Sequence, residues 1–191
     1  RLGATTTWAE LVETPLPPLF DGLKQAAREV GGRQIQNTGT LAGNLCNASP
    51  AADGVPPLLA LGAEVELAGR TGVRRLPLGS FIVGNRRTVL GPDELLVALH
   101  VPQPTHLARS AFLKLGARRY LVISIAMAAA TLEIVDGVVA TARIAVGACS
   151  AVAQRLPALE AALAGAPLAG LAKRVTTAHA ASLSPIDDVR A

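Results

Sequence analysis

The chain has 191 residues, of which 50% are hydrophobic, 17% charged and 3% aromatic, and its formal net charge is +4. High apolar content with low net charge excludes an intrinsically disordered chain, and a protein of this length can bury a proper core. The longest nearly apolar run, 121–132, is too short to span a membrane, which takes about 20 residues. The first residues show no apolar segment of the kind that a signal peptide needs.

The basic residues are scattered, which is typical of a solvated surface, and the few aromatic residues provide no stacking platform for single-stranded nucleic acid. We therefore expect no nucleic-acid partner. Cys46 and Cys149 form no C-x-x-C motif and stand at no ligand spacing from a histidine, so no metal site is expected. Two isolated cysteines without a secretion signal fit a reducing cytoplasm.

The first 30 residues predict the end of a strand and two helices. Residues 1–4 resemble a strand end, and Thr7 and Glu10 have the spacing of a capping box that opens a short helix. Apolar residues at helical spacing predict a helix over 18–30, which a glycine pair ends. Because chains rarely begin with half a strand, we expect another part of this domain to precede residue 1.

A segment rich in glycine and asparagine follows at 31–57. It also carries Ile35, Leu41 and Leu45, whereas a plain linker would be more polar. We therefore predict a loop that is folded against another part of the protein.

The next 50 residues predict a mixture of short elements. Two prolines in the first turn favour a helix over 55–61. Strands are predicted over 63–67 and 74–78, paired across a turn, then a short helix over 77–83 and a strand over 94–101.

A change of character near residues 104–110 predicts a boundary between units 1–105 and 106–191. Asp136-Gly137 between two β-rich runs predicts a hairpin, since a type I′ turn needs positive φ at both central residues. The elements predicted for the second unit are strands over 110–115, 122–135 and 138–149, and helices over 157–164 and 168–181. The fold class is α+β: a mixed or antiparallel first unit, then a small three-stranded antiparallel sheet with covering helices.

The segment 36–53 holds the chemistry. Its small residues let a ligand approach the backbone, and a loop leading into a helix start presents amides that suit a pyrophosphate. Its neutral hydrogen-bonding side chains are Thr40, Asn44, Asn47 and Ser49. Asp53 adds an acceptor for a ribose hydroxyl. This set fits a dinucleotide site, and it fits a tight loop with capping residues equally well.

The same segment closely resembles the flavin-binding domain of the molybdenum hydroxylases, the family of xanthine dehydrogenase and the medium subunit of carbon monoxide dehydrogenase. The family signature is Thr-x-Gly-Gly-Asn, then Ala-Ser-Pro and Asp. This chain has Thr40-Leu41-Ala42-Gly43-Asn44, Ala48-Ser49-Pro50 and Asp53. Further landmarks at 114–120 and 143–148 extend the resemblance over essentially the whole chain.

The resemblance implies which residues contact FAD. The residues implied for the diphosphate and ribose are Thr40, Ala42, Gly43 and Asn44, and those for the ribityl and adenosine side are Asn47, Ser49 and Asp53. It also implies that Leu96 packs on the cofactor, that Lys114 lies near the flavin ring and that Tyr120 lies over it. An ordinary surface or core tyrosine is the alternative for Tyr120. No catalytic side chain is required, because the redox chemistry belongs to the cofactor.

The implied function is that of a flavoprotein subunit, which passes electrons from iron–sulfur centres through FAD to an acceptor. The implied partners are an iron–sulfur subunit and a molybdopterin subunit. Two departures favour an alternative, a structural or assembly fragment without FAD. Ala42 replaces a glycine, at a cost of about 1 kcal/mol if the backbone there is left-handed. The family's first motif, Ala-Gly-Gly-x-Ser, is also not found, so we expect the chain alone to hold little FAD and to be inactive.

Overall fold

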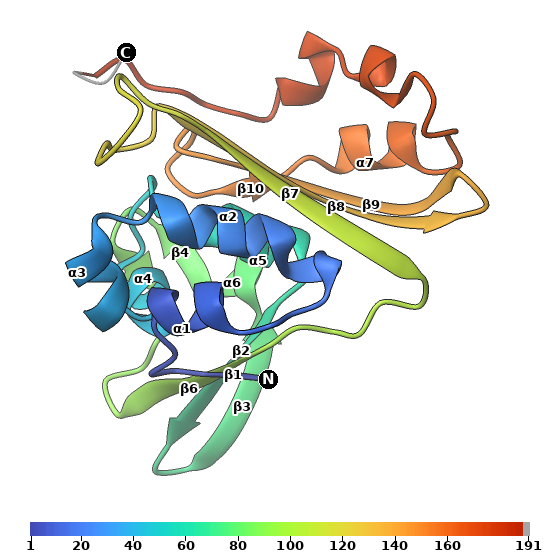
Figure 1. The fold of residues 1–191 in the computed structure, drawn as a ribbon. Coiled ribbons are helices and arrows are strands. Elements are labelled where there is room, and N and C mark those ends of the chain that lie inside the picture. Colours follow the sequence, from blue (N-terminus) through green and yellow to red (C-terminus); the bar gives the residue numbers. More distant parts are fainter. Residues whose placement is uncertain (189–191) are drawn as a thin grey trace.

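The computed structural model describes residues 1–188. Two four-stranded antiparallel sheets enclose a layer of helices (Figure 1). The first sheet has the order β1-β6-β2-β3, with β1 (Leu2–Gly3), β6 (Glu94–His100), β2 (Glu64–Gly69) and β3 (Gly72–Pro77). The second has the order β10-β9-β8-β7, with β10 (Gln154–Arg155), β9 (Val138–Gly147), β8 (Ala126–Val135) and β7 (Leu107–Leu115). The predicted α+β class with antiparallel sheets is confirmed.

The helices between the sheets are α1 (Trp8–Glu13), α2 (Asp21–Glu29), α3 (Arg33–Thr38), α4 (Leu41–Asn47), α5 (Val55–Ala60) and α6 (Leu78–Phe81), with the 3₁₀ turn η1 (Pro18–Phe20). Strands β4 (Ile82–Gly84) and β5 (Arg87–Thr88) form a separate small hairpin. On the other face of the second sheet lie α7 (Pro157–Leu163) and the 3₁₀ turns η2 (Leu171–Arg174) and η3 (Thr177–Ala180). Within the described residues, no helix is long and apolar enough to cross a membrane.

Local signals place several elements where they were predicted. The Thr7 hydroxyl accepts from the Glu10 amide at 3.2 Å, and the Glu10 carboxylate accepts from the Thr7 amide at 2.7 Å, so the capping box is confirmed. Asp136 and Gly137 have φ values of 50° and 77°, as a type I′ turn requires. The hairpin that they close joins β8 to β9, and the hairpin of β2 and β3 is also present.

Four predictions of secondary structure were wrong in part. The segment predicted as a loop over 31–57 contains α3 and α4. Burial of Leu41 and Leu45 stabilises α4 although local propensity disfavours it, whereas Ile35 of α3 is 53% exposed. The last predicted helix, over 168–181, is replaced by η2 and η3. Leu171 packs on the smaller core, but Leu168 and Val175 are 40% and 53% exposed, so most of the predicted apolar stripe is not covered. Residues 122–125 precede β8 rather than belong to it, and the two-residue strand β10 adds a fourth strand to the predicted three.

The main core lies between the two sheets and draws on both halves of the chain. Trp8, Leu23 and Leu99 belong to it, together with Phe112 and Met127 of the second sheet. A smaller core lies between α7 and the other face of the second sheet, formed by Val139, Ala142, Leu156, Leu159 and Leu163.

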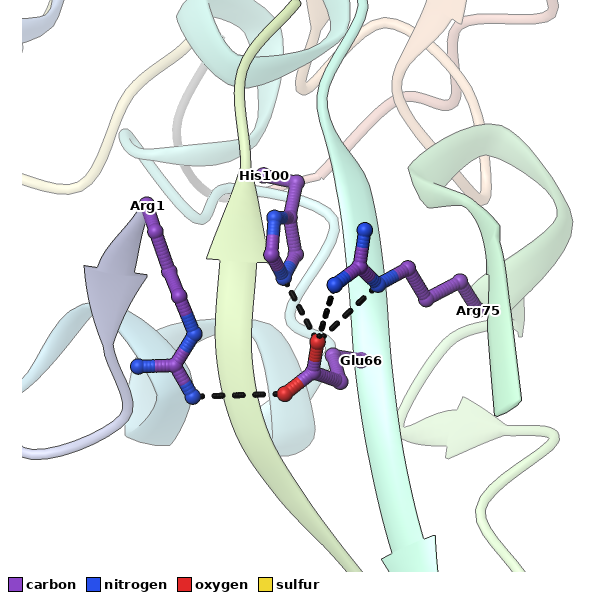
Figure 2. A network of polar contacts seen from close by, with 4 residues as sticks. All are labelled: Arg1, Glu66, Arg75 and His100. Carbon is purple, nitrogen blue, oxygen red and sulfur yellow. Dashed lines mark hydrogen bonds and ion pairs between the residues drawn. The ribbon is translucent and has the colours of Figure 1, made fainter. Parts of the chain in front are cut away.

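A polar network joins the strands of the first sheet on one face (Figure 2). Glu66 accepts from His100 Nε2 at 2.7 Å, from Arg75 Nε at 2.9 Å and from Arg1 Nη2 at 3.2 Å. The hydrogen bond from His100, followed by those from Arg1 and Arg75, lowers the pKa of Glu66 from 4.5 to about 2. The carboxylate therefore stays charged through the physiological range and links all four strands.

Candidate functional site

Helix α4 carries the first group of predicted site residues. Thr40 caps it, since its hydroxyl accepts from the Gly43 amide at 3.0 Å. The Leu41 amide donates to Thr6 O at 3.1 Å, which fixes the start of α4 beside the start of α1. Ala42 lies inside the helix with its side chain in the core. The left-handed backbone considered for this position is therefore not present, and alanine causes no strain there.

The glycines of this region make room for protein rather than for a ligand. A Cβ on Gly54 would lie 2.5 Å from Cη2 of Trp8, and one on Gly39 would lie 2.9 Å from the Ile35 carbonyl oxygen and 3.3 Å from Cδ1 of Trp8. The contacts at 2.5 and 2.9 Å are shorter than a Cβ tolerates, so these glycines allow the backbone to pack closely against the Trp8 indole. Packing against Trp8 therefore accounts for glycine at both positions.

Asn44 has an unusual environment. Its Oδ1 atom is buried and has no hydrogen-bond partner among the described residues. A buried acceptor without a donor costs about 1–3 kcal/mol, so such atoms are uncommon unless a ligand or water completes them. A Cβ on Gly54 would lie 2.8 Å from this same oxygen. The structure therefore keeps one unsatisfied acceptor in the segment that the sequence singled out.

Asn47 and Ser49 lie at and just beyond the end of α4. Asn47 Oδ1 accepts from Arg86 Nη1 at 2.6 Å, and Ser49 Oγ accepts from the Ala51 amide at 3.3 Å. The residues 49–51 also line a cavity of about 620 Å³ together with Asn85. Sequence analysis missed Arg86. The Gly84-Asn85-Arg86 stretch between two apolar runs has the composition of a turn and was the available signal.

Asp53 is bonded to another predicted site residue. Its Oδ2 accepts from Lys114 Nζ at 2.7 Å, and its Oδ1 accepts from Ser124 Oγ at 2.6 Å. The side chains of Lys114 and Asp53 are only 7% and 10% exposed. The structure thus brings together two residues that are 61 positions apart, and it joins the segment after α4 to β7 and to the loop 116–125. Ser124 was also missed, and no spacing in the sequence indicates it.

Leu96 and Tyr120 have opposite environments. Leu96 is 7% exposed and belongs to the main core, in a strand against which α4 packs. Tyr120 is 55% exposed, on the loop 116–125. Its hydroxyl would lie 4.0 Å from a Cβ on Gly32, so this loop reaches the turn before α3. Tyr120 is thus separate from the Asp53 and Lys114 pair, on the outer side of the same loop.

Two family models match the chain. Residues 1–104 match the FAD binding domain in molybdopterin dehydrogenase, and residues 111–191 match the CO dehydrogenase flavoprotein C-terminal domain. Among curated relatives, the xanthine dehydrogenase FAD-binding subunit of Escherichia coli O157:H7 is 33% identical, over 99% of this chain and 64% of its own length. The nicotine 6-hydroxylase medium subunit of Paenarthrobacter nicotinovorans is 32% identical, over 99% of this chain and 66% of its own length.

The fold is shared with solved structures. A chain of carbon monoxide dehydrogenase from Hydrogenophaga pseudoflava matches with a TM-score of 0.86 and 28% identity, covering 97% of this chain and 65% of that one. Quinoline 2-oxidoreductase from Pseudomonas putida 86 matches with a TM-score of 0.85 and 27% identity, with the same coverage. The chain therefore spans about two thirds of the length of the proteins that it matches.

Proposed function

Because the chain belongs to the family of FAD-binding domains in molybdopterin dehydrogenases, we propose that it is the flavin-bearing part of a molybdenum hydroxylase-type dehydrogenase. In this role it passes electrons from iron–sulfur centres to an acceptor. Its partners are an iron–sulfur subunit and a molybdopterin subunit of the same complex, and its location is the cytoplasm. The names of its relatives, which are FAD-binding and medium subunits, support this assignment.

The buried Oδ1 of Asn44 is the observation that carries the proposal. Each hydroxyl of a ribityl or ribose group is a donor, so a bound FAD would satisfy this acceptor and remove the cost of leaving it unpaired. Gly43 directly precedes Asn44 in α4, and Thr40, which caps the helix, lies one turn before it. The residues present therefore fit the cofactor.

When bound, FAD supplies one- and two-electron redox chemistry. The chain positions and shields it. Asp53 accepts from the Lys114 ammonium at 2.7 Å, so a buried ion pair lies at the entry to the loop 116–125. Tyr120 on that loop is exposed and free to cover a ligand. Leu96 belongs to the main core, in the strand β6 against which α4 packs. No side chain needs to act as an acid or base.

A structural or assembly fragment is the second candidate. Three side-chain oxygens of residues assigned to FAD already have protein donors, since Asn47 Oδ1 accepts from Arg86, Asp53 Oδ2 accepts from Lys114 and Asp53 Oδ1 accepts from Ser124. We further propose that the 191-residue chain alone binds FAD only weakly and has no enzymatic activity. The missing first glycine motif supports this view.

Trp8, the single tryptophan, is an internal probe for the test because it packs beside Gly54 and Asn44. FAD is titrated into the 191-residue chain while tryptophan and flavin fluorescence are followed, for the parent, N44A and C46A. Cys46 is an exposed residue of the same helix and serves as the control. We expect saturable weak binding that is about tenfold weaker in N44A and unchanged in C46A.

The stability of the ligand-free chain separates binding from folding. N44A removes an acceptor that has no donor, so we expect no loss of unfolding free energy without FAD. Equal FAD affinity in parent and N44A, or no saturable binding by the parent, would instead favour the assembly fragment.

A further inference from the structure

The turn between β4 and β5 contacts the end of α4. Asn85 and Arg86 form this turn, in a hairpin where Gly84 pairs with Arg87. The Arg86 amide donates to Ala48 O at 2.8 Å, and its guanidinium Nη1 donates to Asn47 Oδ1 at 2.6 Å. One residue thus binds the last helical residue and the residue that ends the helix, through main chain and side chain together.

Both partners of the main-chain bond have a left-handed backbone. Ala48 has φ 47° and Arg86 has φ 57°. This conformation is unfavourable for residues with a Cβ, and it persists only where the surroundings determine it; such positions concentrate at ligand clamps and switches. Glycine would suit the turn better at position 86, so arginine occupies this position at a local cost in backbone energy.

Ala48 lies between two parts of the flavin-binding segment, the one that contains Asn44 and the one that contains Asp53. Asn44, with its unsatisfied oxygen, lies one helical turn before it. After it, the chain passes through 49–51 to Asp53, which holds Lys114. Asn85 of the turn and residues 49–51 line the same cavity, so the turn and the segment after α4 border one space.

We propose that Arg86 is a positioning residue for the flavin-binding segment. Its two hydrogen bonds fix the end of α4 and thereby the relative placement of Asn44 and Asp53. It holds Asn47 by the side-chain oxygen and leaves the amide nitrogen of Asn47 as the donor available to a ligand. This inference rests on the proposed FAD-binding function, but the contact itself can be tested without the cofactor.

Hydrogen exchange of the 191-residue chain tests the contact. R86G removes the guanidinium, relieves the left-handed backbone and keeps the amide that binds Ala48. R86K keeps a charged donor, N47A removes the acceptor, and R87A removes the neighbouring exposed arginine as a control. We expect exchange at residues 45–52 to rise about tenfold in R86G and N47A, to recover partly in R86K and to match the parent in R87A. R86G and N47A combined should add little to either alone.

FAD titration with Trp8 fluorescence tests the consequence, at a temperature where every variant is folded. We expect R86G to bind FAD about tenfold more weakly than R87A. The proposal would be overturned if exchange in R86G were the same as in the parent, or were raised equally over the whole chain rather than at residues 45–52. It would also be overturned if the parent bound FAD and R86G bound it with the same affinity. If the parent takes up no FAD while the local exchange effect is present, the positioning role of Arg86 stands and the proposed function fails.

Discussion

Two carboxylates in this protein each accept hydrogen bonds from several side chains. Glu66 binds groups from three other segments of the first sheet (Figure 2), and Asp53 binds Lys114 and Ser124 from the second half of the chain. For Glu66, opposite charge and hydrogen bonds both favour the ionised carboxylate, so its contacts are stabilising only while it is charged. Two predictions follow from this arrangement at the scale of single residues.

Acid should destabilise the protein partly through Glu66. Its pKa is about 2 in the folded chain against 4.5 ordinarily, so its contribution is present above pH 4.5 and is lost as the pH falls toward 2. We expect E66Q to unfold at lower urea concentration at pH 7 and to lose less stability than the parent between pH 4.5 and 2. Glu94, whose pKa is lowered to about 2 mainly by Arg74, accounts for part of the remaining dependence. Identical pH profiles for parent and E66Q would contradict this prediction.

The buried pair of Asp53 and Lys114 gives the second prediction. D53A leaves an ammonium that is 7% exposed without its carboxylate, and we expect a loss of about 3–5 kcal/mol in unfolding free energy. D53A/K114M removes both charges and should be more stable than D53A. Urea unfolding measures all three chains. A double variant that is no more stable than D53A would show that the pair is not coupled in this way.

At the scale of elements, the packing of helix α2 on strand β7 depends on a close approach between their backbones. Helix α2 lies against β7, the edge strand of the second sheet. The Gly22 amide donates to Ser110 Oγ at 2.8 Å, and Gln25 Oε1 accepts from the Phe112 amide at 2.7 Å. The second contact satisfies a backbone amide of the strand edge, and α2 covers this edge, which would otherwise offer unpaired groups to another chain.

Gly22 is needed for this approach. A Cβ there would lie 2.9 Å from the Ala111 carbonyl carbon, and backbone cannot move aside as a flexible side chain can. We expect G22A to lose about 2 kcal/mol of unfolding free energy, although alanine is the better helix former. The control is G79A in α6, where a Cβ would meet only Leu59 Cδ2 at 3.7 Å. Equal stability of the two variants in urea would contradict the prediction.

For the whole molecule, the helices are shared between two sheets. Helix α5 packs on β8 and β9, and α4 and α6 pack on strands of the first sheet (Figure 1). The link between the halves is also fixed, because Glu133 of β8 accepts from the amides of Thr105 and His106 at 3.1 and 3.2 Å. The proposed division into units 1–105 and 106–191 therefore does not correspond to two separate cores.

The shared core predicts a single unfolding transition. Trp8 fluorescence reports on the first half, and far-UV circular dichroism reports on the strands of both. Since Trp8 and Met127 belong to one core, we expect the two signals to give the same midpoint and slope in urea. An earlier loss of either signal would show that the halves unfold independently. Residues 168–188, which are largely exposed, contribute little to either signal.

Sequence by itself determined the features that depend on neighbours along the chain. The Thr7 capping box, the Asp136-Gly137 turn and the strand alternation are local, because their hydrogen bonds and dihedral angles involve a few adjacent residues. The motif from Thr40 to Asp53 identified the family for the same reason, since its residues are contiguous. The helix predicted over 168–181 shows the limit of such patterns, because an apolar stripe stabilises a helix only where something covers it.

Only the tertiary structure decided which of these residues meet. Lys114 and Asp53 are 61 positions apart, Arg86 and Asn47 are 39 apart, and Ser124 and Asp53 are 71 apart. The conversion of the predicted loop into α4 likewise depends on burial of Leu41 and Leu45 against the rest of the core. Contacts at such separations form because packing of the two sheets on one helical layer brings distant segments together, and no spacing within the sequence expresses that packing.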